Sequence, residues 1–248
     1  MFISFKNKFI FLSNPKCGST SIRAIIDPYS NVDGSSLSDG LLLNPDSSEE
    51  LKSNIKQGVD FLHMNSTRAK AVFDSFGNTE ELKAISNWND YYRFTTIRSP
   101  FKRLVSWYFM LAPDKNFRTM IISDWDKDTA FHHNFNDFLD HFHNSQEGLL
   151  PNYEWFCKDH NTGELLLNDV FKIEEIDQDF PDKFKETTGI TLPSPIPNIL
   201  PDKKTKEDGS RYIKYKGNPY ELYNDNSIDI VKEVYKTDLE LFNYEFGQ

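Results

Sequence analysis

One segment near the start of the chain, residues 9–23, constrains the fold more than any other. It reads Phe-Ile-Phe-Leu-Ser-Asn-Pro-Lys-Cys-Gly-Ser-Thr-Ser-Ile-Arg. Its first four residues are apolar, as in a buried strand, and a turn with proline and glycine follows before hydroxyl residues open a helix. Backbone N–H groups in such a loop point inward, the helix dipole favours negative charge, and Lys16 adds a positive charge. The segment therefore predicts a binding site for a phosphate or sulfate group.

The order of residues in this loop excludes two common phosphate-binding motifs. G-x-x-x-x-G-K-[ST] is absent because Lys16 precedes Gly18, the only glycine of the loop, and G-x-G-x-x-G is absent as well. This argues against a kinase or a nucleoside triphosphatase. Cys17 and Arg23 do fit the C-x5-R pattern of phosphatases, in which a thiolate lies beneath an anion loop. That alternative stays open, although Arg23 is expected inside the helix.

A second segment, residues 93–109, also points to an anion. It reads Arg-Phe-Thr-Thr-Ile-Arg-Ser-Pro-Phe-Lys-Arg-Leu-Val-Ser-Trp-Tyr-Phe. A β-rich run ends at Arg98, Ser99 suits a helix N-cap, and Pro100 suits the first helical position. Arginine supplies a forked charge and serine a hydroxyl donor, so Arg98 and Ser106 are expected to flank one phosphate. One apolar face of this helix is expected to pack on the sheet: Phe101, Val105, Tyr108 and Ala112.

Together the two segments resemble the sulfotransferases that use 3′-phosphoadenosine 5′-phosphosulfate (PAPS), and among them the carbohydrate-type members similar to sulfotransferase family 2. Residues 14–21 resemble their 5′-phosphosulfate loop, and residues 93–109 resemble their 3′-phosphate segment. The resemblance continues at residues 170–174, a strand ending in glutamate, and at residues 238–244, which match Asp-x-x-x-Phe-x-Tyr. The sequence departs from the commoner family pattern at Cys17, Ser19 and Ser99.

The resemblance implies an α/β fold, a three-layer α/β/α domain with a P-loop-NTPase-like parallel sheet and the PAPS-binding loop after the first strand. The alternation of predicted strands and helices favours the same architecture. We expect a single sulfotransferase domain over residues 1–248, with a C-terminal basic loop and helix at 201–248. The other expected elements are a loop at 28–48, a helix at 49–57, a strand at 58–63, a helix capped by Asn65 or Ser66, a helix start at 78–81, short helices at 136–142 and 152–158, a strand at 170–173, a helix from 174 to 188 closed by Gly189, and one amphipathic helix at 225–242.

The resemblance further implies that PAPS donates a sulfuryl group to an acceptor hydroxyl, with a carbohydrate as the expected acceptor and without a metal. Lys16 is expected to stabilise charge on the leaving phosphate. The base is expected to be His63, at a predicted strand end, or Glu174, and this choice stays open. A non-catalytic nucleotide-binding protein of the same fold is the main alternative. The expected donor-binding residues are Pro15, Lys16, Cys17, Gly18, Ser19, Thr20, Ser21, Arg98, Ser106 and Lys214.

Charge and cysteine content limit the partners and the compartment. The formal net charge of −10 argues against nucleic acid or an anionic membrane as the main partner. The two cysteines, Cys17 and Cys157, are far apart and are expected as reduced thiols. The sequence has no apolar run of about eighteen residues and no secretory signal, so a cytoplasmic enzyme is expected.

Overall fold

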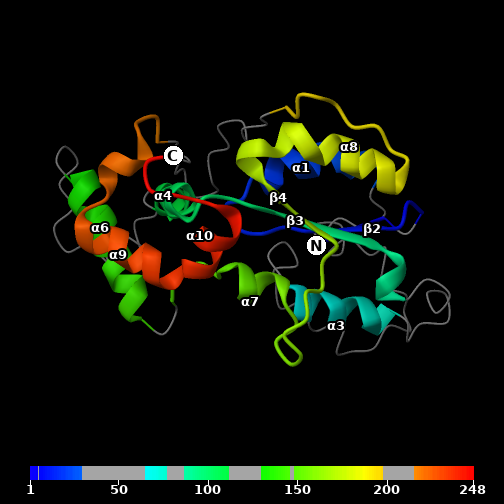
Figure 1. Ribbon diagram of the computed structural model, residues 1–248, viewed down its shortest axis with the longest axis horizontal. Coiled ribbons are helices and arrows are strands. Elements are labelled where there is room, and N and C mark those ends of the chain that lie inside the picture. The colour runs from blue at the N-terminus through cyan, green and yellow to red at the C-terminus, as the bar shows by residue number, and fades with distance from the viewer. Residues whose placement is uncertain (5, 30–64, 77–86, 112–129, 146–147, 198–214) are drawn as a thin grey trace, which may run out of the picture. The chain divides into compact units, whose positions relative to one another are not determined.

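The chain folds into two compact units (Figure 1). The sheet unit comprises Met1–Ile97 and Glu154–Leu200, and the helical unit comprises Arg98–Tyr153 and Pro201–Gln248. The structure, a computed structural model, describes residues 1–4, 6–29, 65–76, 87–111, 130–145, 148–197 and 215–248.

The described residues of the sheet unit form a four-stranded mixed sheet in the order β1-β2-β3-β4. The strands are β1 (Phe2–Ser4), β2 (Phe9–Leu12), β3 (Tyr92–Ile97) and β4 (Asp169–Lys172). β1 runs antiparallel to β2, whereas β2, β3 and β4 run parallel to one another. The carboxyl ends of these three strands therefore meet at one edge of the sheet, the carboxyl edge, where α/β proteins bind their ligands.

β1 corrects two expectations from the sequence. The sheet is mixed rather than parallel, and the anion loop follows the second strand of the chain rather than the first. β1 has three residues, fewer than the roughly four to eight by which a strand is recognised in a sequence. It forms because its side chains are buried and Phe2 pairs with Phe11 across the ladder. Asn7 supports the turn between β1 and β2 by donating to the Ser4 hydroxyl at 2.8 Å.

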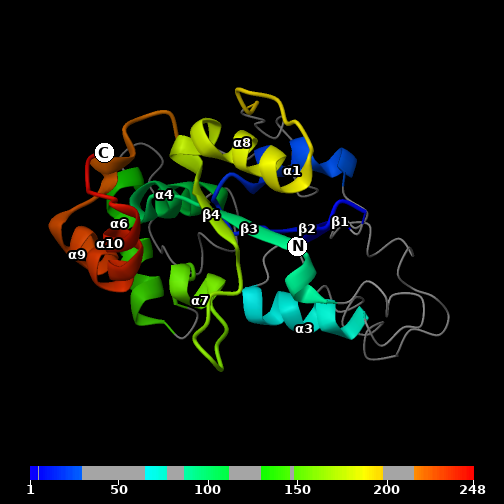
Figure 2. The same cartoon turned by 45° about the vertical axis from the view of Figure 1, so that its right-hand side comes forward.

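Aromatic side chains form the core on one face of the sheet. Two helices, α1 (Ser19–Ile26) and α8 (Ile176–Thr188), cover that face (Figures 1 and 2). The ring centroid of Phe94 lies 5.2 Å from that of Phe11 and 5.3 Å from that of Phe180. The buried members of this core are Phe2, Phe9, Phe11, Ile22, Ile25, Ile26, Tyr92, Phe94, Phe171, Ile176, Phe180, Phe184, Leu192 and Ile196. Because these rings pack closely against one another, the strands and the two helices rigidly support the loop between β2 and α1.

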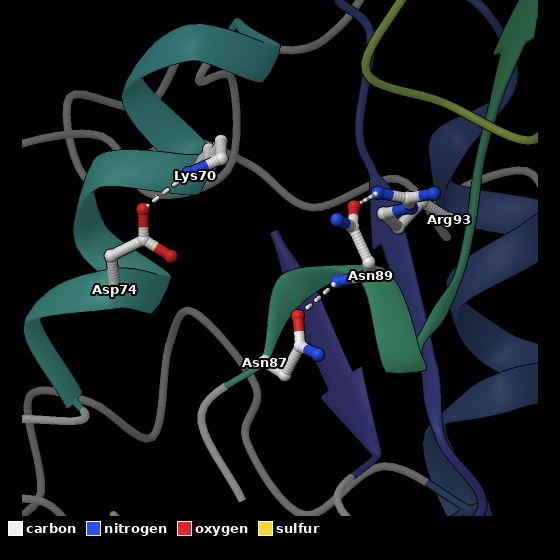
Figure 3. Close-up of polar contacts among 5 residues, drawn as sticks. All are labelled: Lys70, Asp74, Asn87, Asn89 and Arg93. Atoms are coloured by element: carbon white, nitrogen blue, oxygen red, sulfur yellow. Dashed lines mark hydrogen bonds and ion pairs between the residues drawn. The ribbon is translucent and has the colours of Figure 1, made fainter.

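A third helix, α3 (Ser66–Phe76), lies on the other side of the sheet in both views (Figures 1 and 2). Asn65 Oδ1 accepts a hydrogen bond from the backbone N of Arg68 at 2.9 Å, so Asn65, one of the two predicted candidates, caps the helix. Lys70 and Asp74, one turn apart, form an ion pair of 2.5 Å on the helix surface (Figure 3). Both side chains are exposed, so this pair contributes little to stability.

Side-chain hydrogen bonds hold the amino end of β3 (Figure 3). Arg93 donates from Nη1 to Asn89 Oδ1 at 2.8 Å and from Nε to Asn168 Oδ1 at 3.0 Å. Asn89 belongs to the 3-10 turn Trp88–Asp90, whose cap is Asn87. The side chain of Asn87 accepts from the backbone N of Asn89 at 3.1 Å. Arg93 is therefore a structural residue at the end of the strand opposite to the carboxyl edge.

The helical unit has a second aromatic core between its helices. Those entirely inside it are α4 (Pro100–Leu111), α6 (Ala130–Asn144), α9 (Asp225–Val234) and α10 (Lys236–Phe242). The sequence predicts an apolar face of α4, and this face belongs to a core that includes residues of α6 and α9. This core is formed by Phe101, Leu104, Val105, Tyr108, Phe109, Phe135, Phe138, Leu139, Phe142, Leu222, Val231 and Tyr235.

Tyr235 divides the predicted C-terminal helix 225–242 into α9 and α10. Its backbone, with φ −109° and ψ 24°, leaves the helical region. Its side chain is fully buried, and its hydroxyl donates to the carbonyl of Leu150 at 2.6 Å. The sequence 225–242 contains neither proline nor glycine, so its pattern predicts one continuous helix. The break coincides with a tertiary contact that no local pattern encodes.

Other expected elements are confirmed or lie outside the described residues. The short helix α7 (Tyr153–Cys157) is present, and Gly189, with φ 74°, ends α8 as predicted. α8 begins at Ile176, after a 3-10 turn at Ile173–Glu175, rather than at residue 174. None of the helices among the described residues is long and apolar enough to cross a membrane. The expected elements at 49–57, 58–63 and 78–81 lie outside the described residues, as do most of the loop 28–48 and of the basic loop that begins at residue 201.

Candidate functional site

The predicted anion loop, residues 14–21, lies at the carboxyl edge of the sheet unit. It follows β2 closely, and α1 begins within it at Ser19. Lys16 and Gly18 have positive φ angles of 63° and 76°, and Cys17 between them does not. When the sign of φ alternates in this way, successive backbone N–H groups turn to one side and line an anion-binding concavity. The loop thus has the backbone geometry that its sequence predicts.

Three amide groups of the loop have no hydrogen-bond partner among the residues that the structure describes. The N–H groups of Cys17 and Ser21 are bonded to loop carbonyls at 3.3 Å and 3.1 Å. Within the described part of the chain, the N–H groups of Gly18, Ser19 and Thr20 make no hydrogen bond. They stand at the N-terminus of α1, where the helix dipole adds positive potential. Three adjacent donors at this place suit the oxygens of a phosphate or sulfate.

Gly18 is required at its position for two reasons. Its φ of 76° is one that residues with a Cβ rarely adopt. A Cβ built on Gly18 would also lie 2.5 Å from both Cδ1 and Cγ1 of Ile173, the residue that follows β4. The loop therefore passes so close to the end of β4 that only glycine fits.

Two adjacent threonines of β3 support the loop and the strand before it, a role that sequence reasoning missed. Thr96 Oγ1 donates to the carbonyl of Cys17 at 2.7 Å, and Thr95 Oγ1 donates to the carbonyl of Leu12 at 2.5 Å. Both threonines are fully buried. Successive side chains point to opposite faces of a strand, so Thr95 and Thr96 lie on different faces of β3. Thr95 bonds to the end of β2, and Thr96 bonds to the loop. The available signal was the adjacent pair of hydroxyl residues between Phe94 and Ile97 in a strand that the sequence predicts.

The side chains of the loop add charge and hydroxyl groups to these donors. Lys16 is half-buried, as are Ser19 and Ser21, while Thr20 is exposed. Pro15, which precedes the lysine, is half-buried too. The structure therefore keeps the predicted donor-binding residues 15–21 together in one turn.

Cys17 and Arg23 are not arranged as in a phosphatase. The Cys17 thiol is fully buried and donates to the carbonyl of Pro15 at 3.4 Å. The Arg23 guanidinium lies over the ring of Phe2, 4.5 Å from its centroid, and so stacks on β1. An inaccessible thiol and an arginine engaged elsewhere both argue against the C-x5-R alternative. In the structure Cys17 and Cys157 are buried and form no disulfide with each other.

The parallel register places Glu174 at the same edge as the loop. Ile97, the last residue of β3, pairs with Lys172, the last residue of β4. Glu174 follows two residues later and is exposed, while its neighbour Glu175 forms an ion pair of 3.1 Å with Lys172. Arg98 directly follows Ile97 in the chain. The loop and one of the two candidate bases thus belong to the carboxyl edge.

The second predicted segment, residues 93–109, begins in β3 of the sheet unit and continues from Arg98 in the helical unit. Arg98 and Ser106 are both half-buried, as expected of residues that meet a ligand. Arg103, in the same motif, has an exposed fraction of only 3% and donates from Nη1 to the carbonyl of Pro151 at 2.8 Å. Arg98, before α4, and Arg103, on α4, therefore differ in environment. Of these two arginines, only Arg98 is accessible enough to bind a ligand.

Two predicted site residues, His63 and Lys214, lie outside the described residues. The choice between His63 and Glu174 as base thus stays a prediction. Among the residues that the structure describes, no three His, Cys, Asp or Glu side chains gather into a metal-binding group.

A comparison with protein-family models matches residues 1–245 to the model described as Sulfotransferase family. The chain belongs to the sulfotransferase family. The match confirms the resemblance inferred from the two phosphate motifs, and it spans both compact units. No curated protein and no solved structure matches the chain. Membership in this family supports sulfotransferase activity and thus a transferase.

Proposed function

We propose that this sulfotransferase uses PAPS as donor and transfers its sulfuryl group to an acceptor hydroxyl, with a carbohydrate as acceptor. Residues 1–248 then act as one sulfotransferase domain made of the two compact units. Its sheet unit corresponds to a three-layer α/β/α arrangement of the P-loop-NTPase-like kind, with α1 and α8 on one face and α3 on the other.

The observation that carries the proposal is the set of amide donors at Gly18, Ser19 and Thr20. They form a cradle for a tetrahedral anion at a helix N-terminus, and Lys16 adds a full charge beside it. A phosphosulfate presents several such anionic oxygens. We assign the 5′-phosphosulfate to Pro15–Ser21, with backbone donors from the loop and hydroxyl donors from its serine and threonine residues.

The 3′-phosphate of PAPS distinguishes it from ordinary adenine nucleotides. We assign this phosphate to Arg98 and Ser106, with Lys214 as a further cation. A forked guanidinium recognises phosphate through two parallel hydrogen bonds, and a hydroxyl adds a third. The half-buried state of Arg98 and Ser106 supports this assignment.

The transfer itself needs a base, a cation and a positioned donor. His63 or Glu174 removes the proton from the acceptor hydroxyl as its oxygen bonds to sulfur. The bond between sulfur and the bridging oxygen breaks, and its electron pair leaves with 3′-phosphoadenosine 5′-phosphate (PAP). Lys16 stabilises the charge that develops on that phosphate. Protons and electrons balance without a further reactant.

Trp155 is our candidate contact for a sugar ring. Several aromatic residues suit stacking on a sugar, but Tyr108 and Tyr153 are buried in the helical unit. Trp155 has an exposed fraction of 48%. Its ring centroid lies 5.2 Å from that of His160, whose Nε2 donates to the Trp155 carbonyl at 2.8 Å. An exposed, well-supported indole offers the flat apolar surface on which sugars stack.

Calorimetric titration with PAP, AMP and ATP tests the donor site. We expect PAP to bind at least about tenfold more tightly than AMP, and Arg98→Ala to abolish that preference. Lys102→Ala is the matched control because it removes a positive charge from α4, four residues after Arg98. Lys16→Ala is expected to weaken PAPS use and turnover. Equal affinity for PAP and AMP in the wild-type protein would overturn the proposed donor.

Base variants test the chemistry once a carbohydrate screen with PAPS yields an acceptor. We expect either His63→Ala or Glu174→Gln to lower kcat by about a hundredfold or more with PAP affinity unchanged. Glu175→Gln, one residue further along, is the matched control and keeps its activity. Unchanged kcat in both base variants would refute both assignments. PAP binding without turnover on any acceptor would favour a non-catalytic nucleotide-binding protein.

A further inference from the structure

Three side chains of the helical unit hold one short piece of backbone, Leu150–Tyr153, here named the crossing segment. Tyr235 donates its hydroxyl to the carbonyl of Leu150 at 2.6 Å. Arg103 donates from Nη1 to the carbonyl of Pro151 at 2.8 Å. Asp238 accepts from the backbone N of Tyr153 with both carboxylate oxygens, at 2.8 Å and 3.1 Å. Backbone groups of three of the four residues are thus bonded to side chains from elsewhere in the chain.

The three side chains are buried. Tyr235 is fully buried, Arg103 is 3% exposed and Asp238 is 7% exposed. Hydrogen bonds to a charged group are stronger than those between neutral groups. A buried backbone N–H or C=O without a hydrogen-bond partner destabilises the fold. The crossing segment is therefore held in one conformation by contacts that water does not replace.

The three side chains come from two helices of the unit, α4 and α10, and from the break that precedes α10. Arg103 stands on α4 between Arg98 and Ser106, the two residues assigned to the 3′-phosphate. Tyr235 and Asp238 stand at the start of the C-terminal helix α10. The crossing segment ends at Tyr153, the last residue of the helical unit before the chain enters the sheet unit at Glu154. α4 is thus bonded to the place where the chain leaves its unit.

We propose that Arg103 is a positioning residue that ties α4 to the crossing segment, so that binding of the 3′-phosphate by α4 further stabilises the bonded conformation of that segment. This inference rests on the proposed function for its ligand. Arg103 belongs to the phosphate motif in sequence, but its guanidinium serves the backbone of Pro151. The matched contrast is Arg98, which is half-buried and precedes the helix.

Hydrogen exchange at the amide of Tyr153, with and without saturating PAP, tests the proposal. We expect PAP to slow this exchange by about tenfold in the wild-type protein, equivalent to about 1.4 kcal/mol, and AMP to slow it less. Arg103→Met keeps most of the apolar stem and removes the donor. In this variant we expect PAP affinity within about threefold of wild type, a faster basal exchange at Tyr153, and no slowing by PAP.

Two further variants keep the test sharp. Arg103→Lys can still donate to the Pro151 carbonyl and is expected to restore part of the PAP effect. Arg98→Met is expected to lose the preference for PAP over AMP while basal exchange at Tyr153 stays as in wild type. Should Arg103→Met fail to fold, Arg103→Lys still gives the readout as a partial loss of the PAP effect, and Tyr235→Phe tests the segment separately because it removes only the bond to Leu150.

The outcomes separate this inference from the proposed function. Loss of the PAP preference in Arg103→Met would make Arg103 a phosphate ligand and overturn the proposal. Full PAP-dependent slowing in Arg103→Met would also overturn it, since the contact would then transmit nothing. A wild-type protein that does not bind PAP would remove the proposed function and with it the ligand effect. In that event the structural link between Arg103 and the crossing segment is refuted only if Arg103→Met leaves basal exchange at Tyr153 unchanged.

Discussion

The two phosphate motifs of this sulfotransferase are built in different ways. The loop 14–21 owes its shape to backbone geometry: two residues of positive φ, a close approach to Ile173, and a carbonyl held by Thr96. The segment at 98–106 is regular helix after its first two residues, and its chemistry lies in side chains. One of them, Arg103, is buried on the Pro151 carbonyl.

This difference teaches where each motif tolerates change. A backbone-built cradle accepts different side chains at most positions, because its donors are amide groups that every residue but proline has. The departures at Cys17 and Ser19 fit that tolerance. A side-chain-built site accepts no such exchange, since each ligand contact belongs to one residue. The predictions below test this contrast, starting with the largest expected effect.

Gly18→Ala is expected to break the loop most severely. A positive φ at alanine costs about 1–2 kcal/mol and the contact with Ile173 about 1–3 kcal/mol more, so we expect a total loss of about 3 kcal/mol. Denaturant unfolding measures this loss of stability, and PAP titration measures the accompanying loss of anion binding by the loop.

Gly163→Ala is the matched control for Gly18→Ala. Gly163 has a similar φ of 74°, and a Cβ there meets nothing within 4 Å. Gly163→Ala should lose only the stability that a positive φ at alanine costs, and it should bind PAP as tightly as the wild-type protein. Adding Ile173→Ala to Gly18→Ala should recover the difference between the two glycine variants. Equal losses at Gly18 and Gly163 would mean that the close approach does not matter.

Asp238→Ala is expected to cost about 2 kcal/mol by leaving the Tyr153 N–H without its charged acceptor. Asp238→Asn keeps one acceptor oxygen and should cost roughly half as much. Thermal and urea unfolding compare these variants with Asp229→Asn, an exposed aspartate of α9, which should stay near wild type. A loss no larger than that of Asp229→Asn would refute the role assigned to this carboxylate.

Thr96→Val is expected to cost about 1 kcal/mol and to weaken PAP binding, because the Cys17 carbonyl loses its donor. Thr95→Val removes a similar buried bond, to Leu12, that does not reach the loop. It should cost as much stability and leave PAP affinity unchanged. If both variants weaken PAP binding equally, Thr96 supports the sheet rather than the loop.

The smallest effect is expected in alkaline solution. Burial, with a smaller contribution from the charge of Asp90, raises the pKa of Tyr91 from its ordinary value of 10.0 to about 12. Between these values only the unfolded chain ionises at this residue, so stability present below pH 10 falls as the pH rises toward 12. Tyr91→Phe should therefore lose less stability than wild type between pH 10 and 11. Identical slopes of unfolding free energy against pH would contradict the raised pKa.

Much of the fold was predictable because its signals are local. The strand Phe9–Leu12, the helix start at Ser19, the cap at Asn65 and the end of α8 at Gly189 each follow from a few neighbouring residues. The errors have different causes. The strand β1 pairs with its neighbour β2 but is shorter than the run by which a strand is recognised in a sequence. The break at Tyr235 coincides with a hydrogen bond to Leu150, 85 residues away in the chain.

The sequence by itself determined the family and predicted the two phosphate-binding segments, because glycine, proline and charge spacing act within a single turn. Only the tertiary structure decided which motif residues are available to a ligand. It buried the Cys17 thiol, placed Arg23 on Phe2, and turned Arg103 toward Pro151. It also brought Thr96 beneath the Cys17 carbonyl across 79 residues of chain. Such contacts depend on the packing of distant elements, which short-range spacing does not encode.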